Sequence, residues 1–201
     1  MEQNIVTLTQ EEHDLAVSVG RKYHSTARLE RLTCGADQFH PYARTEDKEW
    51  CHIIGALGEI AAAKYLKIPW NRAEDWFKKV ADLGTRISVR TRSKRKYGRQ
   101  WAGLLVRKDD FDECPPDMAF VAVIPAENEW GIGQLGFDVT GWAYQRECEA
   151  WGHWETYNWR SPCLIVDRER QRPMSELLEM VKSNPAAWGV KLLKPEPLFR
   201  E

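Results

Sequence analysis

Apolar residues recur every three to four positions in the first third of the chain, a spacing that predicts helices there. The first helix should begin near Thr9, because Thr9 and Glu12 have the spacing of a capping box. Leu15, Val19 and Tyr23 would then share one face of this helix. We expect that face to be the one packed against the core.

A second helix is predicted over residues 45–68, with Thr45 as its cap and Pro69 at its end. Its apolar face is broad, as expected for a helix deep in a core. Gly55 and Gly58 lie inside it, and each costs about 1 kcal/mol relative to alanine. A helix that keeps both glycines is expected to pack very close to another part of the backbone.

The middle of the chain changes to the patterns of β-strands. Residues Ile87–Arg92 alternate between apolar and polar, whereas Met118–Ile124 is a continuous apolar run typical of a strand buried on both faces. The other expected elements are strands at Trp101–Val106, Trp130–Gly133, Phe137–Trp142 and Cys163–Val166, and helices at Ala143–Trp151 and Ser175–Lys182. This order predicts an α+β or mixed α/β fold, with a meander of strands forming a central mixed sheet of about four to five strands flanked by helices.

The length of 201 residues fits a single domain. We expect an N-terminal helical elaboration over 1–44, a core over 45–145, and a C-terminal wrap and tail over 146–201. The cysteines are odd in number and none has CxxC spacing, which favours reduced thiols over a disulfide framework or a zinc site. No signal-peptide pattern or membrane-length apolar run is present, so a cytoplasmic protein without a membrane partner is expected.

Charge is unevenly distributed although the formal net charge is only −1. Residues 83–108 contain nine Lys or Arg side chains and no acidic one, and residues 109–155 are almost entirely acidic among their charged positions. The basic segment has two open interpretations: a strand and loop that contact phosphates, or a hairpin whose charges pair with the acidic stretch. The acidic 109–155 region is itself a candidate surface for a protein partner.

Four residues occur in an order that has chemical meaning. Glu59 lies on the second helix, Asp82 precedes a strand, and Ser88 and Arg90 lie on that strand. This order resembles the PD-(D/E)XK nuclease superfamily, and the segments from Asp82 onward resemble an uncharacterised group of small phage and bacterial proteins with that core. The resemblance implies a restriction-endonuclease-like core over 45–145, cleavage of DNA with Mg²⁺ or Mn²⁺ held by Glu59 and Asp82, and a possible homodimer. It places the protein in the cytoplasm, or in the host cytoplasm if a phage encodes it.

The chain departs from the family pattern at two positions. Ser88 replaces a carboxylate and Arg90 replaces a lysine, and an arginine side chain stabilises negative charge but does not act as a base. A nuclease fold without catalysis, kept as a nucleic-acid-binding or host-protein-binding module, is therefore the alternative. Taken singly, Glu59 also fits an exposed helix glutamate, and Asp82 fits a turn aspartate.

The basic strand and loop supply the residues expected to contact nucleic acid. Ser88, Arg90 and Arg92 should share one strand face, which suits a phosphate cradle. The expected nucleic-acid contacts are Arg92, Lys94, Arg95, Lys96, Tyr97 and Arg99. No phosphate-binding glycine loop or serine-hydrolase motif is present, and the scattered histidines lack metal-site spacing, although His52 lies two turns before Glu59 on the same helix.

Overall fold

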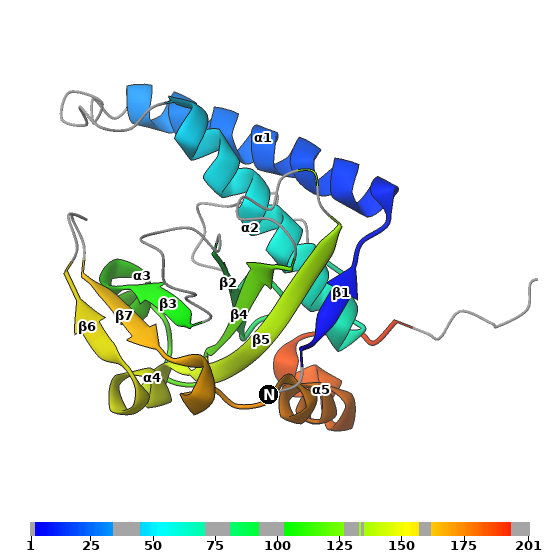
Figure 1. Cartoon of the computed structure of the whole chain (residues 1–201), viewed down its shortest axis with the longest axis vertical. Coiled ribbons are helices and arrows are strands. Elements are labelled where there is room, and N and C mark those ends of the chain that lie inside the picture. Colours follow the sequence, from blue (N-terminus) through cyan, green and yellow to red (C-terminus); the bar gives the residue numbers. More distant parts are fainter. Residues whose placement is uncertain are drawn as a thin grey trace, which may run out of the picture.

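A mixed β-sheet divides the molecule into two layers of packing (Figure 1). The structure is a computed structural model that describes residues 3–33, 45–70, 81–92, 103–126, 133, 135–156 and 162–193. Long helices cover one face of this central sheet, and a second, smaller sheet with two short helices lies on the other side. The α+β class with a mixed sheet flanked by helices, predicted from the sequence, is therefore confirmed.

The central sheet, sheet A, has four strands in the order β1-β5-β4-β2. Strand β2 runs parallel to β4, and the other neighbours are antiparallel. The strands are β1 (Ile5–Thr7), β2 (Ile87–Thr91), β4 (Ala119–Pro125) and β5 (Gly136–Tyr144). Because β2 has a partner on one side only, one of its edges is left for other groups.

Some of the strands expected in the central sheet belong instead to a second sheet, sheet B. Its order is β3-β7-β6, and both pairs are antiparallel. The strands are β3 (Leu104–Arg107), β6 (His153–Glu155) and β7 (Cys163–Val166). The predicted meander is wrong because β3 leaves sheet A between β2 and β4 and pairs with a segment about sixty residues later.

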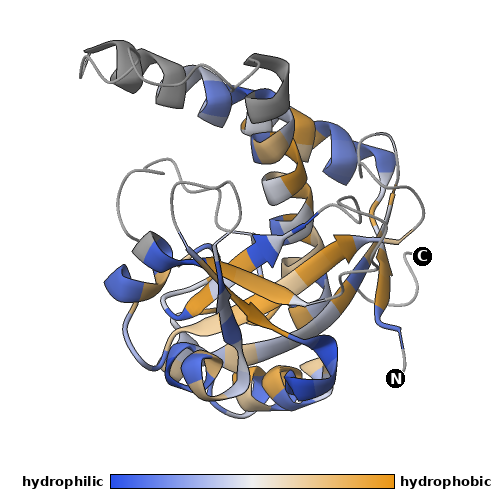
Figure 2. Cartoon of the chain, turned by 60° about the vertical axis from the view of Figure 1, so that its left-hand side comes forward, coloured by the Kyte–Doolittle hydropathy of each residue, from blue (hydrophilic) through white to orange (hydrophobic). Residues whose placement is uncertain are grey.

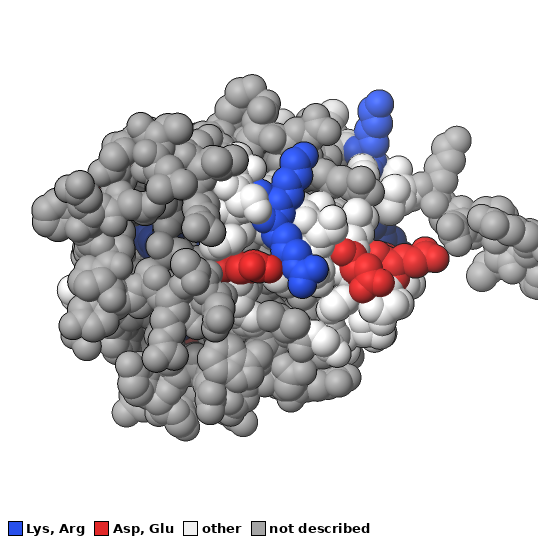
Figure 3. Space-filling model, turned by 90° about the horizontal axis from the view of Figure 1, so that it is seen from above, with Lys and Arg blue, Asp and Glu red and all other residues white. Residues whose placement is uncertain are grey.

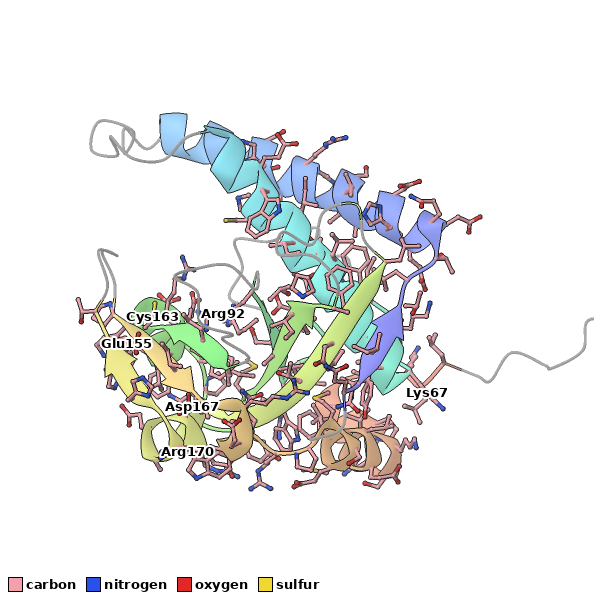
Figure 4. The ribbon with its side chains drawn as sticks, in the orientation of Figure 1. Lys67, Arg92, Glu155, Cys163, Asp167 and Arg170 are labelled. Atoms are coloured by element: carbon pink, nitrogen blue, oxygen red, sulfur yellow. The ribbon has the colours of Figure 1, made fainter. Side chains whose placement is uncertain are left out.

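The helical layer consists of α1 (Gln10–Thr33), α2 (Thr45–Leu66) and α5 (Met174–Ser183). Helix α2 is buried on most sides from Ile53 to Leu66. Parts of this helix and the strands of the sheet below it are both coloured as hydrophobic in Figure 2. Its last turn ends where Lys67, labelled in Figure 4, adopts a left-handed conformation and Ile68 N–H donates to the carbonyl of Ala63. Pro69 follows two residues later.

The opposite face of sheet A packs against sheet B and the shorter helices. These are α3 (Lys108–Glu113), α4 (Gln145–Trp151) and the 3₁₀ turn η2 (Arg168–Arg170). A second 3₁₀ turn, η3 (Pro185–Trp188), follows α5 and adds Trp188 to the core under the helices. Strand β4 lies between the two layers: Val121 and Val123 belong to the core under the helices, and Phe120 and Ala122 to the core under sheet B. This explains its continuous apolar sequence, as predicted.

The N-terminal helix confirms one prediction and corrects another. Thr9 and Glu12 form the predicted capping box, with Glu12 N–H donating to Thr9 Oγ1 over 3.1 Å and Thr9 N–H to Glu12 Oε2 over 2.7 Å. The most buried face carries Ala16 and Gly20, whereas Leu15, Val19 and Tyr23 are only partly buried. A side chain at Gly20 would lie 2.5 Å from Cα of Ile53, so α1 meets α2 along its small residues.

One boundary prediction differs from the structure, and one strand prediction is untested. The helix expected from Ala143 begins at Gln145, because β5 extends to Tyr144. The strand expected at Trp130–Gly133 lies outside the described residues except for Gly133. Among the described helices, none is long and apolar enough to cross a membrane.

Candidate functional site

Asp82 lies beside the edge of β2 that pairs with no described strand, and it accepts a backbone N–H at that edge. Its Oδ2 accepts the backbone N–H of Val89 over 2.6 Å and the hydroxyl of Ser88 over 3.0 Å. A bridge between Leu83 and Ile87 folds the chain back so that Asp82 can reach these donors. Asp82 and Ser88 are therefore parts of one local structure at the start of β2.

Glu59 approaches the same edge from α2. The preceding residue, Gly58, allows this approach: a Cβ there would overlap Thr91 Oγ1 and lie 2.8 Å from Thr91 Cβ and Cγ2. Gly58 therefore sits directly against β2, as expected of a glycine kept inside a helix. A Cβ at Gly55, by contrast, would meet no atom of the described residues within 4 Å, so the close contact expected there is not found among them. The Glu59 carboxylate is partly buried and accepts a hydrogen bond from Trp70 Nε1 over 2.9 Å through Oε2. Its interpretation as an ordinary exposed glutamate is wrong.

The two carboxyl groups interact electrostatically. Burial raises the pKa of Glu59 to about 8, and the negative charge of Asp82 adds to the rise despite Trp70 and Arg90. Burial also raises the pKa of Asp82, against the opposing effects of Arg90 and of the donors Val89 and Ser88. Two acidic groups from separate elements are thus held where their charges are poorly hydrated, a situation that a bound cation relieves.

Arg90 supplies positive charge on the face of β2 that is turned away from the helices. Its guanidinium lies 5.3 Å from the centre of the Phe120 ring, and Nη2 is 3.6 Å from Asp110 Oδ2. Asp110 also accepts two hydrogen bonds, 3.0 and 3.1 Å long, from Arg107. Sequence reasoning did not single out Asp110. Its place at the junction of the basic and acidic segments was the available signal.

The predicted strand face is confirmed for Ser88 and Arg90. Ile87 and Val89 pack in the core beneath the helices, so the alternate residues Ser88 and Arg90 face the opposite layer. Arg92 follows the last residue of β2 and lies on the side of the strand that faces sheet B (Figure 4). The other expected nucleic-acid contacts lie outside the described residues: Lys94, Arg95, Lys96, Tyr97 and Arg99.

Basic and acidic residues pair extensively where both are described. Arg86 contacts Asp117 at 3.0 Å, and Lys108 contacts Asp112 at 2.9 Å, in addition to the Asp110 pairs. Basic and acidic side chains also lie beside one another on the face of the molecule seen in Figure 3. For these members of the basic segment, the interpretation as charges paired with the acidic stretch is therefore correct.

Glu59 and Asp82 fit a divalent cation in the donor atoms they leave available. Oε1 of Glu59 and Oδ1 of Asp82 accept no hydrogen bond from the described residues. Mg²⁺ commonly takes one or two protein carboxylates and completes its shell with water and phosphate oxygens. Within the described ranges, no group of three or more His, Cys, Asp or Glu residues is arranged to hold a metal. His52 packs 5.7 Å from the ring of His24 on α1.

No protein-family model, curated protein or solved structure matches the chain. Its function has to be inferred from the residues and geometry of the site itself.

Proposed function

We propose that the protein binds Mg²⁺ or Mn²⁺ through Glu59 and Asp82 and hydrolyses phosphodiester bonds of DNA in the cytoplasm. The observation that carries this proposal is the placement of two partly buried carboxyl groups at β2: Asp82 bonds to the backbone of the strand, and Glu59 follows the glycine at which α2 meets it. Their proximity across the α2–β2 contact supports a shared role.

The residues around the pair have distinct roles in this proposal. The cation would polarise the scissile phosphate and acidify an attacking water. Ser88 holds Asp82 in place through its hydroxyl, because the hydrogen bond fixes one carboxylate oxygen and leaves the other available. Arg90 stabilises negative charge on the phosphate, and it accepts no proton because its guanidinium stays charged. Arg92 and the basic residues after it hold the nucleic-acid backbone.

Calorimetric titration of Mn²⁺ and Mg²⁺ tests the metal site. Wild type should bind Mn²⁺, and Asp82→Asn should bind it at least about tenfold more weakly, because the variant loses one of two ligand charges. Asp112→Asn is the matched control, since it removes an exposed carboxylate from α3 that pairs with Lys108. Equal Mn²⁺ binding by wild type and Asp82→Asn, or no binding by wild type, would refute the metal site.

Cleavage of supercoiled plasmid DNA tests the activity separately. Wild type with Mn²⁺ should nick or linearise the plasmid, and chelation should stop the reaction. Arg90→Gln should lower the cleavage rate while it keeps Mn²⁺ affinity, because Arg90 stabilises charge without binding the metal. Retained metal binding with no cleavage under any divalent ion would refute hydrolysis but leave the metal site intact.

A nucleic-acid-binding module without catalysis is the second candidate. It is favoured because both residues that depart from the family pattern contact acidic side chains: Ser88 donates to Asp82, and Arg90 lies near Asp110. It predicts DNA binding that weakens steeply with salt and no cleavage. Absence of binding at low salt would rule it out.

Two further expectations from the sequence concern protein partners. The acidic 109–155 region would bind a host protein, and the nuclease resemblance implies a homodimer. Size-exclusion chromatography with light scattering measures directly whether the protein is a homodimer. A monomer at all concentrations would refute the dimer. A pull-down that recovers no partner would count against a host-protein surface in the acidic 109–155 region.

A further inference from the structure

We propose a separate binding site for a small organic anion that carries an apolar ring, in a cavity between the start of β2 and the end of α5. The cavity has a volume of about 450 Å³, within the range of small-molecule sites. Arg86, which lines it, precedes Arg90 of the candidate metal site by four residues, or about 13 Å at 3.3 Å per strand residue. The proposal is independent of the proposed hydrolysis.

Two glycines give the cavity a fixed wall. Gly84 and Gly189 both have left-handed backbone conformations, with φ of +60° and +63°. A side chain at Gly84 would overlap the carbonyl oxygen of Trp188, and one at Gly189 would lie 2.5 Å from Thr85 Cγ2. Thr85 N–H also donates to the Trp188 carbonyl over 2.9 Å. The turn before β2 and the η3 turn are thus locked together, so this side of the cavity is preformed.

Another part of the lining comes from the end of β5 and the start of α4, and both α4 and α5 lie at the lower end of the molecule in Figure 1. Tyr144 packs edge-on against Trp142, with ring centres 4.9 Å apart. The Arg146 guanidinium lies 4.5 Å from the centre of the Tyr144 ring. These contacts hold an aromatic hydroxyl and a cation at one side of the cavity.

Hydrogen-bond donors exceed acceptors among the lining side chains. Arg146 has no ion pair with the described residues, and its guanidinium lies over the Tyr144 ring. Asn184 uses its Oδ1 to accept Ala187 N–H, which leaves its amide donors available. Arg86 is neutralised by Asp117, so Arg146 provides the unbalanced positive charge. A ligand that satisfies these groups must offer acceptors and negative charge.

The remaining lining selects the rest of the ligand. Met180 and Trp188 bring apolar surface to the cavity, and Trp188 is mostly buried. An inorganic ion would leave this surface uncovered, whereas a ring-bearing carboxylate or phosphate would cover it while its charged group contacts Arg146. The ligand class is therefore an aromatic or cyclic monoanion or dianion.

Nuclear magnetic resonance titration of the full chain with phenyl phosphate tests the site. The indole N–H signal of Trp188, assigned with Trp188→Phe, should shift and saturate below about 10 mM ligand. Arg146→Gln should weaken binding about tenfold and Tyr144→Phe by a smaller factor, because each removes a donor from the cavity. Arg21→Gln, which removes an exposed cation from α1, should leave the affinity unchanged.

Two other probes separate charge from apolar contact. Benzyl alcohol keeps the ring without charge, and inorganic phosphate keeps the charge without the ring, so both should bind more weakly than phenyl phosphate. Equal affinity for either probe would overturn the ligand class. No saturable shift with phenyl phosphate, or the same affinity in Arg146→Gln with an unchanged melting curve, would overturn the site.

Discussion

The contact between Gly58 and Thr91 can be tested by adding one methyl group to α2. In Gly58→Ala, the new Cβ would overlap Thr91 Oγ1 and lie 2.8 Å from both Cβ and Cγ2 of Thr91. Rotation of the Thr91 side chain gives no relief, because its Cβ does not move and both branches are already too close. Helix α2 must therefore shift away from β2.

Gly55→Ala is the matched control in the same helix. A Cβ at Gly55 would meet no atom of the described residues within 4 Å, so this variant should gain only the helix propensity of alanine, about 1 kcal/mol. Gly58→Ala gains the same propensity but incurs overpacking that should reach the upper end of the usual range, about 3 kcal/mol. We expect Gly55→Ala to be about 1 kcal/mol more stable than wild type and Gly58→Ala about 2 kcal/mol less stable.

Urea unfolding followed by circular dichroism measures both variants. With a slope of about 2 kcal/mol per molar urea, the midpoints of the two variants should differ by about 1.5 M. Thr91→Ala should recover part of the loss in the Gly58→Ala background and not in the Gly55→Ala background. If Gly58→Ala were as stable as Gly55→Ala, α2 would not lie as close to β2 as described, and the placement of Glu59 would lose its basis.

Three further predictions concern other buried groups. In metal-free buffer, the free energy of unfolding should fall as the pH rises from about 5 to 8. The folded chain retains a proton on Glu59, whose pKa is raised to about 8, whereas the unfolded chain releases that proton near pH 4.5. Glu59→Gln should flatten this profile, and an unchanged slope in the variant would contradict the raised pKa. Arg168→Met should cost about 3–5 kcal/mol in urea unfolding, since it strands the buried carboxylate of Asp138 that Arg168 contacts at 3.0 Å, and a loss below about 1 kcal/mol would contradict the pairing. Iodoacetamide should modify exposed Cys51 in the native protein but not Cys148, whose thiol is buried with its pKa raised to about 12, and peptide mass mapping that finds Cys148 modified as fast as Cys51 would refute this.

Local patterns predicted the elements that depend on neighbouring residues. The Thr9–Glu12 capping box and the strand at Met118–Ile124 follow from short-range spacing and from burial on both faces, and both are present. The pairing of β3 with β7 could not be predicted in this way, because register between distant segments leaves no mark within either one. The same limit explains why β1 was missed: its three residues are too few to show a period.

At the candidate site, sequence order identified Glu59, Asp82, Ser88 and Arg90, but not the hydrogen-bond and ion-pair partners of each. Ser88 holds Asp82 through a hydrogen bond that the spacing alone did not indicate. Asp110 was overlooked because it is one of many acidic residues in its stretch, and its contact with Arg90 depends on how α3 packs beside β2. Side-chain partners of this kind are set by tertiary structure.

The departure of β3 from sheet A has a consequence for synthesis of the chain. Sheet A can join β2, β4 and β5 once residue 144 has left the ribosome, but β3 waits for residues 163–166 before it gains a partner. During that interval, the backbone groups of β3 that will bond to β7 have no strand to receive them. A nascent or truncated chain that stops before Cys163 would therefore present an open strand to other copies, and pairing with β7 protects this edge of β3 from aggregation.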